Sequence, residues 1–139
     1  MKNYYQLNKQ KYKETNKRSM KKRLLKGLCG WCLEKRLSHS VQFCEKHWFR
    51  DKSYKHFKSG KFWEQLKEIA EQQNYTCPYT GDKLIPGFNM SLDHIISKSE
   101  GGVNTVDNVQ WVTWHINVAK SSLSHAEFIE LCKKVANRS

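Results

Sequence analysis

Four residues of metal-binding type occur as two closely spaced pairs in the N-terminal half of the chain. Cys29 and Cys32 form a CxxC pair, and after eleven intervening residues Cys44 and His47 form a CxxH pair. A CxxC pair places two thiolates on one turn, and a CxxH pair on a first helical turn brings a thiolate and an imidazole to face them. Four such ligands suit a closed tetrahedral Zn²⁺ site. Because no coordination position stays open, we expect this zinc to be structural.

A second set of polar residues lies in the C-terminal half. It begins with Asp93-His94, continues through Gly101-Gly102 and Asp107-Asn108, and ends with the run Asn117-Val118-Ala119-Lys120. His94 and Asn108 are fourteen positions apart, and Asn108 and Asn117 are nine apart. Each piece alone is common in proteins. Their order and spacing together indicate one site.

This pattern resembles the HNH (ββα-metal) endonuclease family over about Tyr75 to Ser122, roughly a third of the chain. The resemblance implies hydrolysis of DNA phosphodiesters that leaves a 5′-phosphate and a 3′-hydroxyl. His94 would be the general base, since an imidazole titrates near neutral pH. Asp93 and Asn117 would offer oxygen ligands to one Mg²⁺ (or Mn²⁺). Asn108 resembles the central Asn of the family, which pins the loop and fixes the strand that carries the base.

The resemblance has limits. Members of the family that are stabilised by zinc carry one CxxC pair before the first strand and another near the third motif. At these places this chain has Cys77-Pro-Tyr-Thr80 and Thr113-Trp-His-Ile116, so a second zinc, in the nuclease core, is not expected. Lys120 is a candidate to contact phosphate or to hold Asp93. His115 is either a phosphate contact or a structural residue.

One geometric question stays open at this point. Neighbouring residues of a regular strand point to opposite faces, yet Asp93 and His94 would have to serve the same phosphate. Either a bulge in the strand or a phosphate lying across the edge of the strand would reconcile the two side chains.

The helices and strands that we expect around these residues make up an α+β fold. We expect a ββα-metal nuclease core, a two-stranded hairpin plus a helix, flanked by helices and preceded by a small zinc-binding module. The expected elements are a helix over 61–74, strands over 91–96 and 109–114, a helix from about His115, and a last helix with a Ser124 to Glu127 capping box. On that last helix Phe128, Leu131, Cys132 and Val135 recur at helical spacing and form an apolar stripe, and Cys132 is expected in the core. The expected domains are a basic arm (1–27), a zinc knuckle module (28–59) and an HNH nuclease domain (60–139).

Charge is distributed unevenly along the chain. Residues 1–60 hold 17 Lys and Arg against 4 Asp and Glu, a net of +13, whereas residues 61–139 hold 8 against 9, a net of −1. A strongly basic segment with interspersed aromatic residues favours a polyanionic partner, which we expect to be double-stranded DNA. The arm could be helical on DNA and disordered without it.

The sequence therefore predicts a metal-dependent DNA endonuclease, of a kind that resembles homing or phage endonucleases, acting as a monomer or homodimer on DNA. The alternative is a non-catalytic zinc-knuckle nucleic-acid-binding protein. No stretch is apolar enough for a membrane span and no signal peptide is evident. We expect a cytoplasmic protein, with encoding by a phage in a bacterial host as one option.

Overall fold

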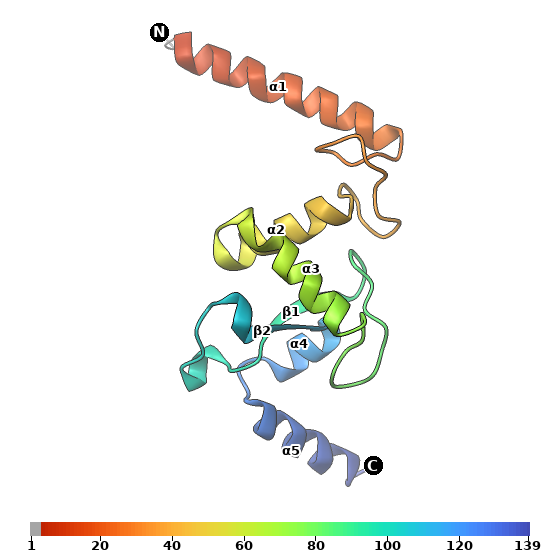
Figure 1. Ribbon diagram of the computed structural model, residues 1–139, viewed down its shortest axis with the longest axis vertical. Coiled ribbons are helices and arrows are strands. Elements are labelled where there is room, and N and C mark those ends of the chain that lie inside the picture. The colour runs from red at the N-terminus through yellow and green to blue at the C-terminus, as the bar shows by residue number, and fades with distance from the viewer. Residues whose placement is uncertain (1–3) are drawn as a thin grey trace. The chain divides into compact units, whose positions relative to one another are not determined.

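The computed structural model describes residues 4–139, so the first three residues of the expected basic arm lie outside it. Among the described residues the fold is α+β, with five α-helices and a single two-stranded antiparallel sheet (Figure 1). The chain divides into two compact units, residues 1–48 and 49–139. The expected boundaries after residues 27 and 59 stay predictions.

The first unit begins with a long polar helix, α1 (Tyr4–Leu25), which carries eight Lys and Arg and a single Glu. It has no continuous apolar stripe, as its sequence indicates, and its described side chains are mostly exposed. The guanidinium of Arg23 donates two hydrogen bonds to the carbonyl of Gly30, at 3.0 and 2.6 Å, and so ties the end of α1 to the cysteine-bearing loop. No helix among residues 4–139 combines the length and the apolar character that a membrane crossing needs.

Helix α2 (Glu45–Phe57) starts directly after Cys44, whose carbonyl accepts a hydrogen bond from the N–H of Trp48. The CxxH spacing predicted the first turn of this helix. Its continuation to Phe57 was not predicted, because this polar segment shows no apolar periodicity.

The second unit is built around the strands β1 (Met90–His94) and β2 (Val109–Thr113), which pair one-to-one from Met90–Thr113 to His94–Val109. Two short 3₁₀ turns, η2 (Lys98–Glu100) and η3 (Val106–Asn108), lie in the connecting loop. Both strands were expected, with slightly later ends. The side chain of Thr113 caps the next helix by accepting the N–H of Ile116, and this ends β2 before Trp114.

Helix α3 (Trp63–Gln72) follows the turn η1 (Gly60–Phe62) and packs its buried Leu66 and Ala70 toward the hairpin. The indole N–H of Trp111, a fully buried β2 residue, donates to the carbonyl of Leu66 at 2.8 Å. Just beyond α3, the side-chain amide of Gln73 makes two hydrogen bonds to the backbone of Trp111. Its Oε1 accepts the N–H and its Nε2 donates to the carbonyl, each at 2.8 Å. One side chain therefore satisfies backbone groups on the free edge of β2.

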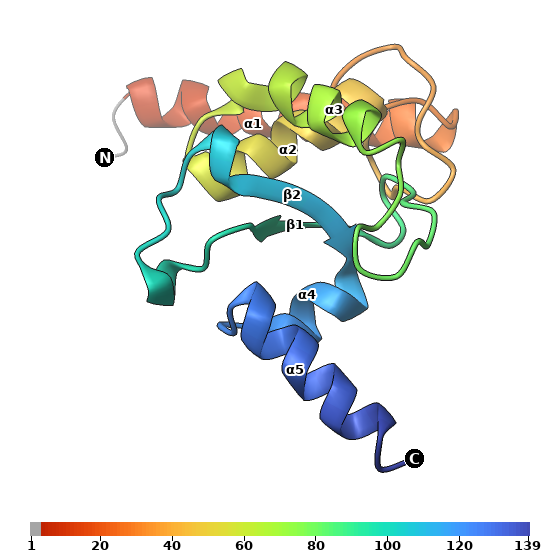
Figure 2. The same ribbon diagram turned by 60° about the horizontal axis from the view of Figure 1, so that its bottom comes forward.

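Helix α4 (Trp114–Lys120) lies on the other side of the hairpin from α3 (Figure 2). The last helix, α5 (His125–Ala136), has the predicted capping box: Ser124 Oγ accepts the N–H of Glu127, and the Glu127 carboxylate accepts the N–H of Ser124.

The prediction that Cys132 is a core residue is wrong, because its side chain is exposed. Of the apolar stripe expected on α5, Phe128 alone is buried, with its ring edge-on to Tyr79 at 5.6 Å. Leu131 and Val135 are exposed like Cys132. Helical periodicity identified the apolar stripe correctly, but the second unit covers only the N-terminal end of that stripe.

Candidate metal centre and active-site cleft

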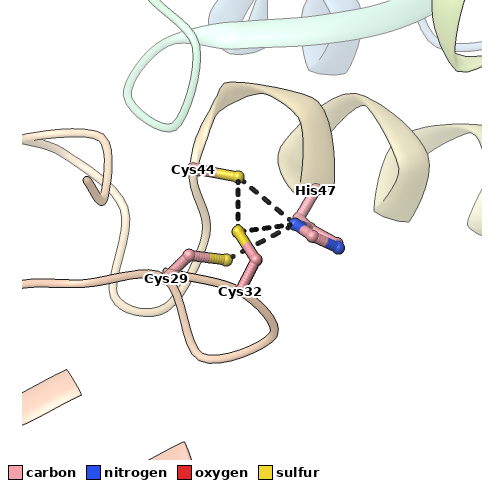
Figure 3. A group of neighbouring side chains, drawn as sticks. All are labelled: Cys29, Cys32, Cys44 and His47. Atoms are coloured by element: carbon pink, nitrogen blue, oxygen red, sulfur yellow. Dashed lines mark hydrogen bonds between the residues drawn. The ribbon is translucent and has the colours of Figure 1, made fainter. Parts of the chain in front are cut away.

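The side chains of Cys29, Cys32, Cys44 and His47 converge from a loop and from the start of α2 (Figure 3). All four ligand atoms lie within 4.8 Å of one another, so the cluster can hold a metal ion. The loop is shaped by a bridge between Leu28 and Lys35, and the N–H of Trp31 points at Cys29 Sγ at 3.4 Å. The sequence prediction of which residues gather here is therefore confirmed.

The distances between these ligand atoms fit a tetrahedral zinc site. Zn–S bonds of about 2.3 Å and a Zn–N bond of about 2.0–2.1 Å imply, at tetrahedral angles, S–S separations of about 3.8 Å and S–N separations of about 3.5 Å. Cys32 Sγ and Cys44 Sγ are 3.7 Å apart. His47 Nδ1 lies 3.5, 3.6 and 3.2 Å from the sulfurs of Cys29, Cys32 and Cys44. His47 thus presents Nδ1, and not Nε2, to the centre.

The electrostatics of the cluster call for a cation. Burial raises the pKa of the Cys44 thiol to about 11, and its Cys32 and Cys29 neighbours add to the rise. Burial also acts to raise the pKa of Cys29, but hydrogen bonds from backbone groups outweigh it and leave that pKa below its ordinary value. Three sulfurs this close cannot all be thiolates at neutral pH unless a positive ion lies between them.

A second cluster of candidate residues lies at β1. Asp93 is buried, and its carboxylate has two partners: Lys120 Nζ lies 3.2 Å from Oδ1 and Gln110 Nε2 donates to Oδ2 at 3.1 Å. Gln110 is the residue directly opposite Asp93 on β2. Lys120 is also buried, and it donates a second hydrogen bond to the carbonyl of His94 at 3.3 Å. Of the two roles expected for Lys120, the structure has it holding Asp93.

The free edge of β1 is covered by side chains of α4. Asn117 Nδ2 donates to Ser91 Oγ at 2.8 Å and to the carbonyl of Leu92 at 3.4 Å, while Lys120 reaches the carbonyl of His94. Carbonyls two residues apart on a strand point to the same side. Asn117 and Lys120 therefore follow one edge, and both of these Asn117 bonds use its amide nitrogen rather than Oδ1.

This arrangement shows how Asp93 and His94, neighbours on one strand, can both border the same cleft. The pairing of β1 with β2 is regular and has no bulge. Both residues nevertheless line a single cleft of about 280 Å³, together with Asn117 and Lys120. The cleft extends over the edge of β1, so side chains from both faces of the strand border it.

The loop between the strands is pinned by buried Asn108. Its Oδ1 accepts the N–H of Ile96 at 2.9 Å, and its Nδ2 donates to the carbonyls of Ile96 and Val103 at 3.0 and 2.8 Å. Asn108 thus has the loop-closing position that the resemblance implied.

The glycine pair of the same loop is required by its geometry. Gly101 has a φ of +83°, and a Cβ on Gly102 would lie 1.9 Å from the carbonyl oxygen of Ile96. A side chain is disfavoured at the first position and excluded at the second.

His94, at the end of β1, has two neighbours that sequence reasoning missed. Its Nε2 is 3.0 Å from Asn104 Oδ1, and its ring stacks on that of His56 with centroids 4.7 Å apart and planes 33° apart. His56 comes from α2 and Asn104 from the loop. Neither residue belongs to a spaced motif, so the sequence held no signal for them.

Comparison of the chain with family models, with curated proteins and with solved structures gives no match. The function is therefore inferred from the geometry of the two sites.

His115 is not brought together with the other candidates. It is exposed on the first turn of α4 and lines a separate cleft of about 560 Å³, beside Trp114 and Phe88. His115 therefore does not line the cleft that contains His94.

Proposed function

We propose that this protein is a metal-dependent DNA endonuclease of the HNH type, with its cutting site in the cleft at the edge of β1. The observation that carries the proposal is the gathering of four side chains around one cleft, two from strand β1 and two from helix α4: Asp93, His94, Asn117 and Lys120. These residues supply a base, two kinds of oxygen ligand and a cation, which are the groups that phosphodiester hydrolysis needs.

His94 is the proposed general base. It is half-buried at the end of β1, next to a buried carboxylate, and lines the cleft where a water could reach its ring. It accepts the proton of the water, whose oxygen forms the new bond to phosphorus. The bond from phosphorus to the 3′-oxygen breaks, and the products are a 5′-phosphate and a 3′-hydroxyl.

The Asp93 carboxylate and the carbonyl oxygen of Asn117 are the proposed Mg²⁺ ligands. Both are hard oxygen donors, and Asn117 Oδ1 is the amide atom not engaged with the strand. Mg²⁺ bound there would stabilise the negative charge that develops on the phosphate.

Lys120 holds the Asp93 carboxylate in place and balances its charge. The net charge of this buried pair is near zero, so the phosphate of bound DNA has to supply the negative charge that favours a divalent cation. We therefore expect Mg²⁺ to bind weakly to the free protein and more tightly in the presence of DNA.

We infer that the cation of the Cys29–His47 cluster is Zn²⁺ and that its role is structural. Four protein ligands at tetrahedral separations leave no position for a water or a substrate. The first unit, residues 1–48, carries 13 Lys and Arg against 3 Asp and Glu, a net of +10. We propose that this charge binds the DNA backbone and that the zinc stabilises the loop to which Arg23 ties α1.

A non-catalytic zinc-knuckle DNA-binding protein is the second candidate. One observation favours it: both oxygens of Asp93 already have partners within the protein, Lys120 and Gln110. If these interactions persisted on DNA, Asp93 would be a structural residue and the cleft would hold no catalytic cation.

Incubation of the purified protein with long duplex DNA separates the two candidates. We expect cutting that needs added Mg²⁺ or Mn²⁺ and leaves ends that a ligase can rejoin directly. The control omits the divalent cation and uses no chelator, because a chelator would also strip the cysteine cluster. Tight binding of intact DNA under all these conditions would favour the second candidate.

A further inference from the structure

The surroundings of His94 assign a function to a residue outside the HNH-like motif, and the assignment rests on the proposed nuclease function. Asn104 lies in the loop between β1 and β2, four positions before the loop-pinning Asn108. Its side-chain amide bridges two histidines that come from different parts of the second unit.

The direction of each hydrogen bond follows from the chemistry of its partner. Asn104 Nδ2 lies 2.9 Å from the backbone carbonyl of His56, which can only accept a hydrogen bond. The NH₂ group of Asn104 must therefore face His56, and its Oδ1 must face His94. Since Oδ1 is an acceptor, His94 Nε2 has to be the donor across the 3.0 Å separation.

A neutral imidazole carries one proton, so a proton on Nε2 leaves the lone pair on Nδ1. The bond to Asn104 occupies Nε2 and leaves Nδ1 as the basic nitrogen of the ring. Any proton that His94 accepts from a water must therefore arrive at Nδ1.

The ring of His94 is also held from its face. His56 stacks on it at 4.7 Å, and Phe57 packs edge-on against His56 at 4.9 Å. The stack restricts the tilt of the His94 ring, while the bond to Asn104 restricts its rotation about χ2. The backbone carbonyl that orients Asn104 belongs to the same residue as the stacking ring.

We propose that Asn104 is a positioning residue that holds His94 in the Nε2–H form and turns Nδ1 toward the nucleophilic water. In the reaction, the water proton moves to Nδ1 as the water oxygen bonds to phosphorus and the bond to the 3′-oxygen breaks. The departing 3′-oxygen takes a proton from solvent water. Asn104 itself does not touch the substrate.

NMR of ¹⁵N-labelled protein without DNA tests the bond directly. We expect the Nε2–H of His94 to give a ring N–H signal that is slow to exchange with water, assigned by its disappearance in His94→Ala. Asn104→Leu removes the acceptor and should abolish the signal, whereas Asn104→Asp keeps an acceptor for His94 Nε2–H and should retain the signal even though it loses the donor to the His56 carbonyl. Thr105→Ala is the matched control, because Thr105 is an exposed neighbour whose side chain does not cap the turn that follows it.

Cleavage kinetics test the consequence. Asn104→Leu should lower kcat by up to about 10²-fold with KM nearly unchanged, since the change affects orientation and not DNA binding. An unchanged ring N–H signal or an unchanged kcat in Asn104→Leu would overturn the assignment. A wild-type protein that never cuts DNA would overturn the nuclease and with it the role of Nδ1, while the NMR signal would still report whether Asn104 holds His94.

Discussion

Substitutions at His94 and at its neighbours are expected to differ in whether they affect stability, function or both. Asp93 and Lys120 form a buried ion pair on one side of β1, and the His56 ring covers His94 on the other. Breaking a buried ion pair leaves an uncompensated charge and is costly, so variants of Asp93 or Lys120 would mix stability with function. His94 is half-buried and lies outside this ion pair, which makes it the cleaner site for a functional test.

Replacement of His94 by Ala should lower the cleavage rate by about 10²–10⁴-fold, because general-base catalysis contributes that much. DNA affinity should stay close to wild type, since one half-buried imidazole adds little to a basic surface. Single-turnover cleavage and a binding titration measure the two quantities. His125→Ala, at an exposed histidine of α5, is the control. Wild-type cutting rates in His94→Ala would remove His94 from the mechanism.

The half-buried environment of His56 leads us to expect that the stability of the protein depends on pH. Burial lowers its pKa from 6.5 to about 4, and electrostatic repulsion from the nearby His94 and Lys98 side chains adds to the effect. Its Nε2 is buried and lacks a hydrogen-bond partner among the described residues. In the unfolded chain His56 takes up a proton near its ordinary pKa, whereas in the folded protein it stays neutral until about pH 4. The free energy of unfolding should therefore fall as the pH decreases from about 6.5 to about 4.

Urea unfolding over this pH range checks the prediction. One proton sets an upper limit of about 1.4 kcal/mol per pH unit, and solvent around the half-buried ring should reduce it. His56→Phe keeps an aromatic ring against His94 but cannot titrate, so its stability should depend less on pH than that of the wild type. Equal pH dependence in the two proteins would contradict a lowered pKa at His56.

At the level of the secondary-structure elements, side chains hydrogen-bond to the backbone groups of the two strands and of the loop between them, and so hold these short segments in place. Gln73 satisfies the outer edge of β2, Asn117 and Lys120 satisfy that of β1, and Asn108 closes the loop between the strands. A two-stranded hairpin alone is only marginally stable. These polar interactions, together with α3 and α4, let a small sheet present a cleft of defined shape.

We expect the cysteine loop to depend on a bound metal for its ordered structure, as the hairpin depends on the helices packed against it. We expect metal analysis to find one Zn²⁺ per chain, and Cys29→Ser or Cys44→Ser to lose both the metal and the ordered structure of this loop. Circular dichroism and limited proteolysis follow the folding. Cys132→Ser is the matched control, because Cys132 is exposed and lies outside the cluster. A metal-free wild-type protein that resists proteolysis equally well would disprove the zinc site.

In the molecule as a whole, positive charge and proposed chemistry belong to different units. Residues 1–48 carry a net charge of +10, whereas the cleft at β1 belongs to residues 49–139. Removal of residues 1–26 would take away most of that charge, but it would also remove Arg23 and its two hydrogen bonds to Gly30. Substitution of exposed lysines on α1 separates charge from structure.

Changing Lys9, Lys11, Lys13 and Lys17 to Gln should weaken DNA binding strongly. The slope of log affinity against log salt concentration should flatten by up to about 0.9 for each phosphate that is no longer neutralised. Cutting should recover partly at low salt or at high protein concentration, because the cleft is untouched. Lys133→Gln with Lys134→Gln on α5 is the control for removal of charge elsewhere. An unchanged salt slope would mean that α1 does not bind the DNA backbone.

Features that depend on spacing within a few residues could be predicted from the amino-acid sequence alone. Examples are the CxxC and CxxH pairs of the cysteine cluster, the capping box at Ser124, and the strand that carries Asp93 and His94. Such features follow from local backbone geometry, in which a CxxC turn or a capped helix brings its own residues together wherever it occurs.

Which residues meet across the chain could be learned only from the folded molecule. Gln110 lies opposite Asp93 because of the strand register, and His56 reaches His94 because α2 packs beside the hairpin. The fold also leaves Cys132 exposed, although its helix was predicted correctly. Periodicity tells which side of an element is apolar, but what covers that side depends on packing between residues far apart in the sequence.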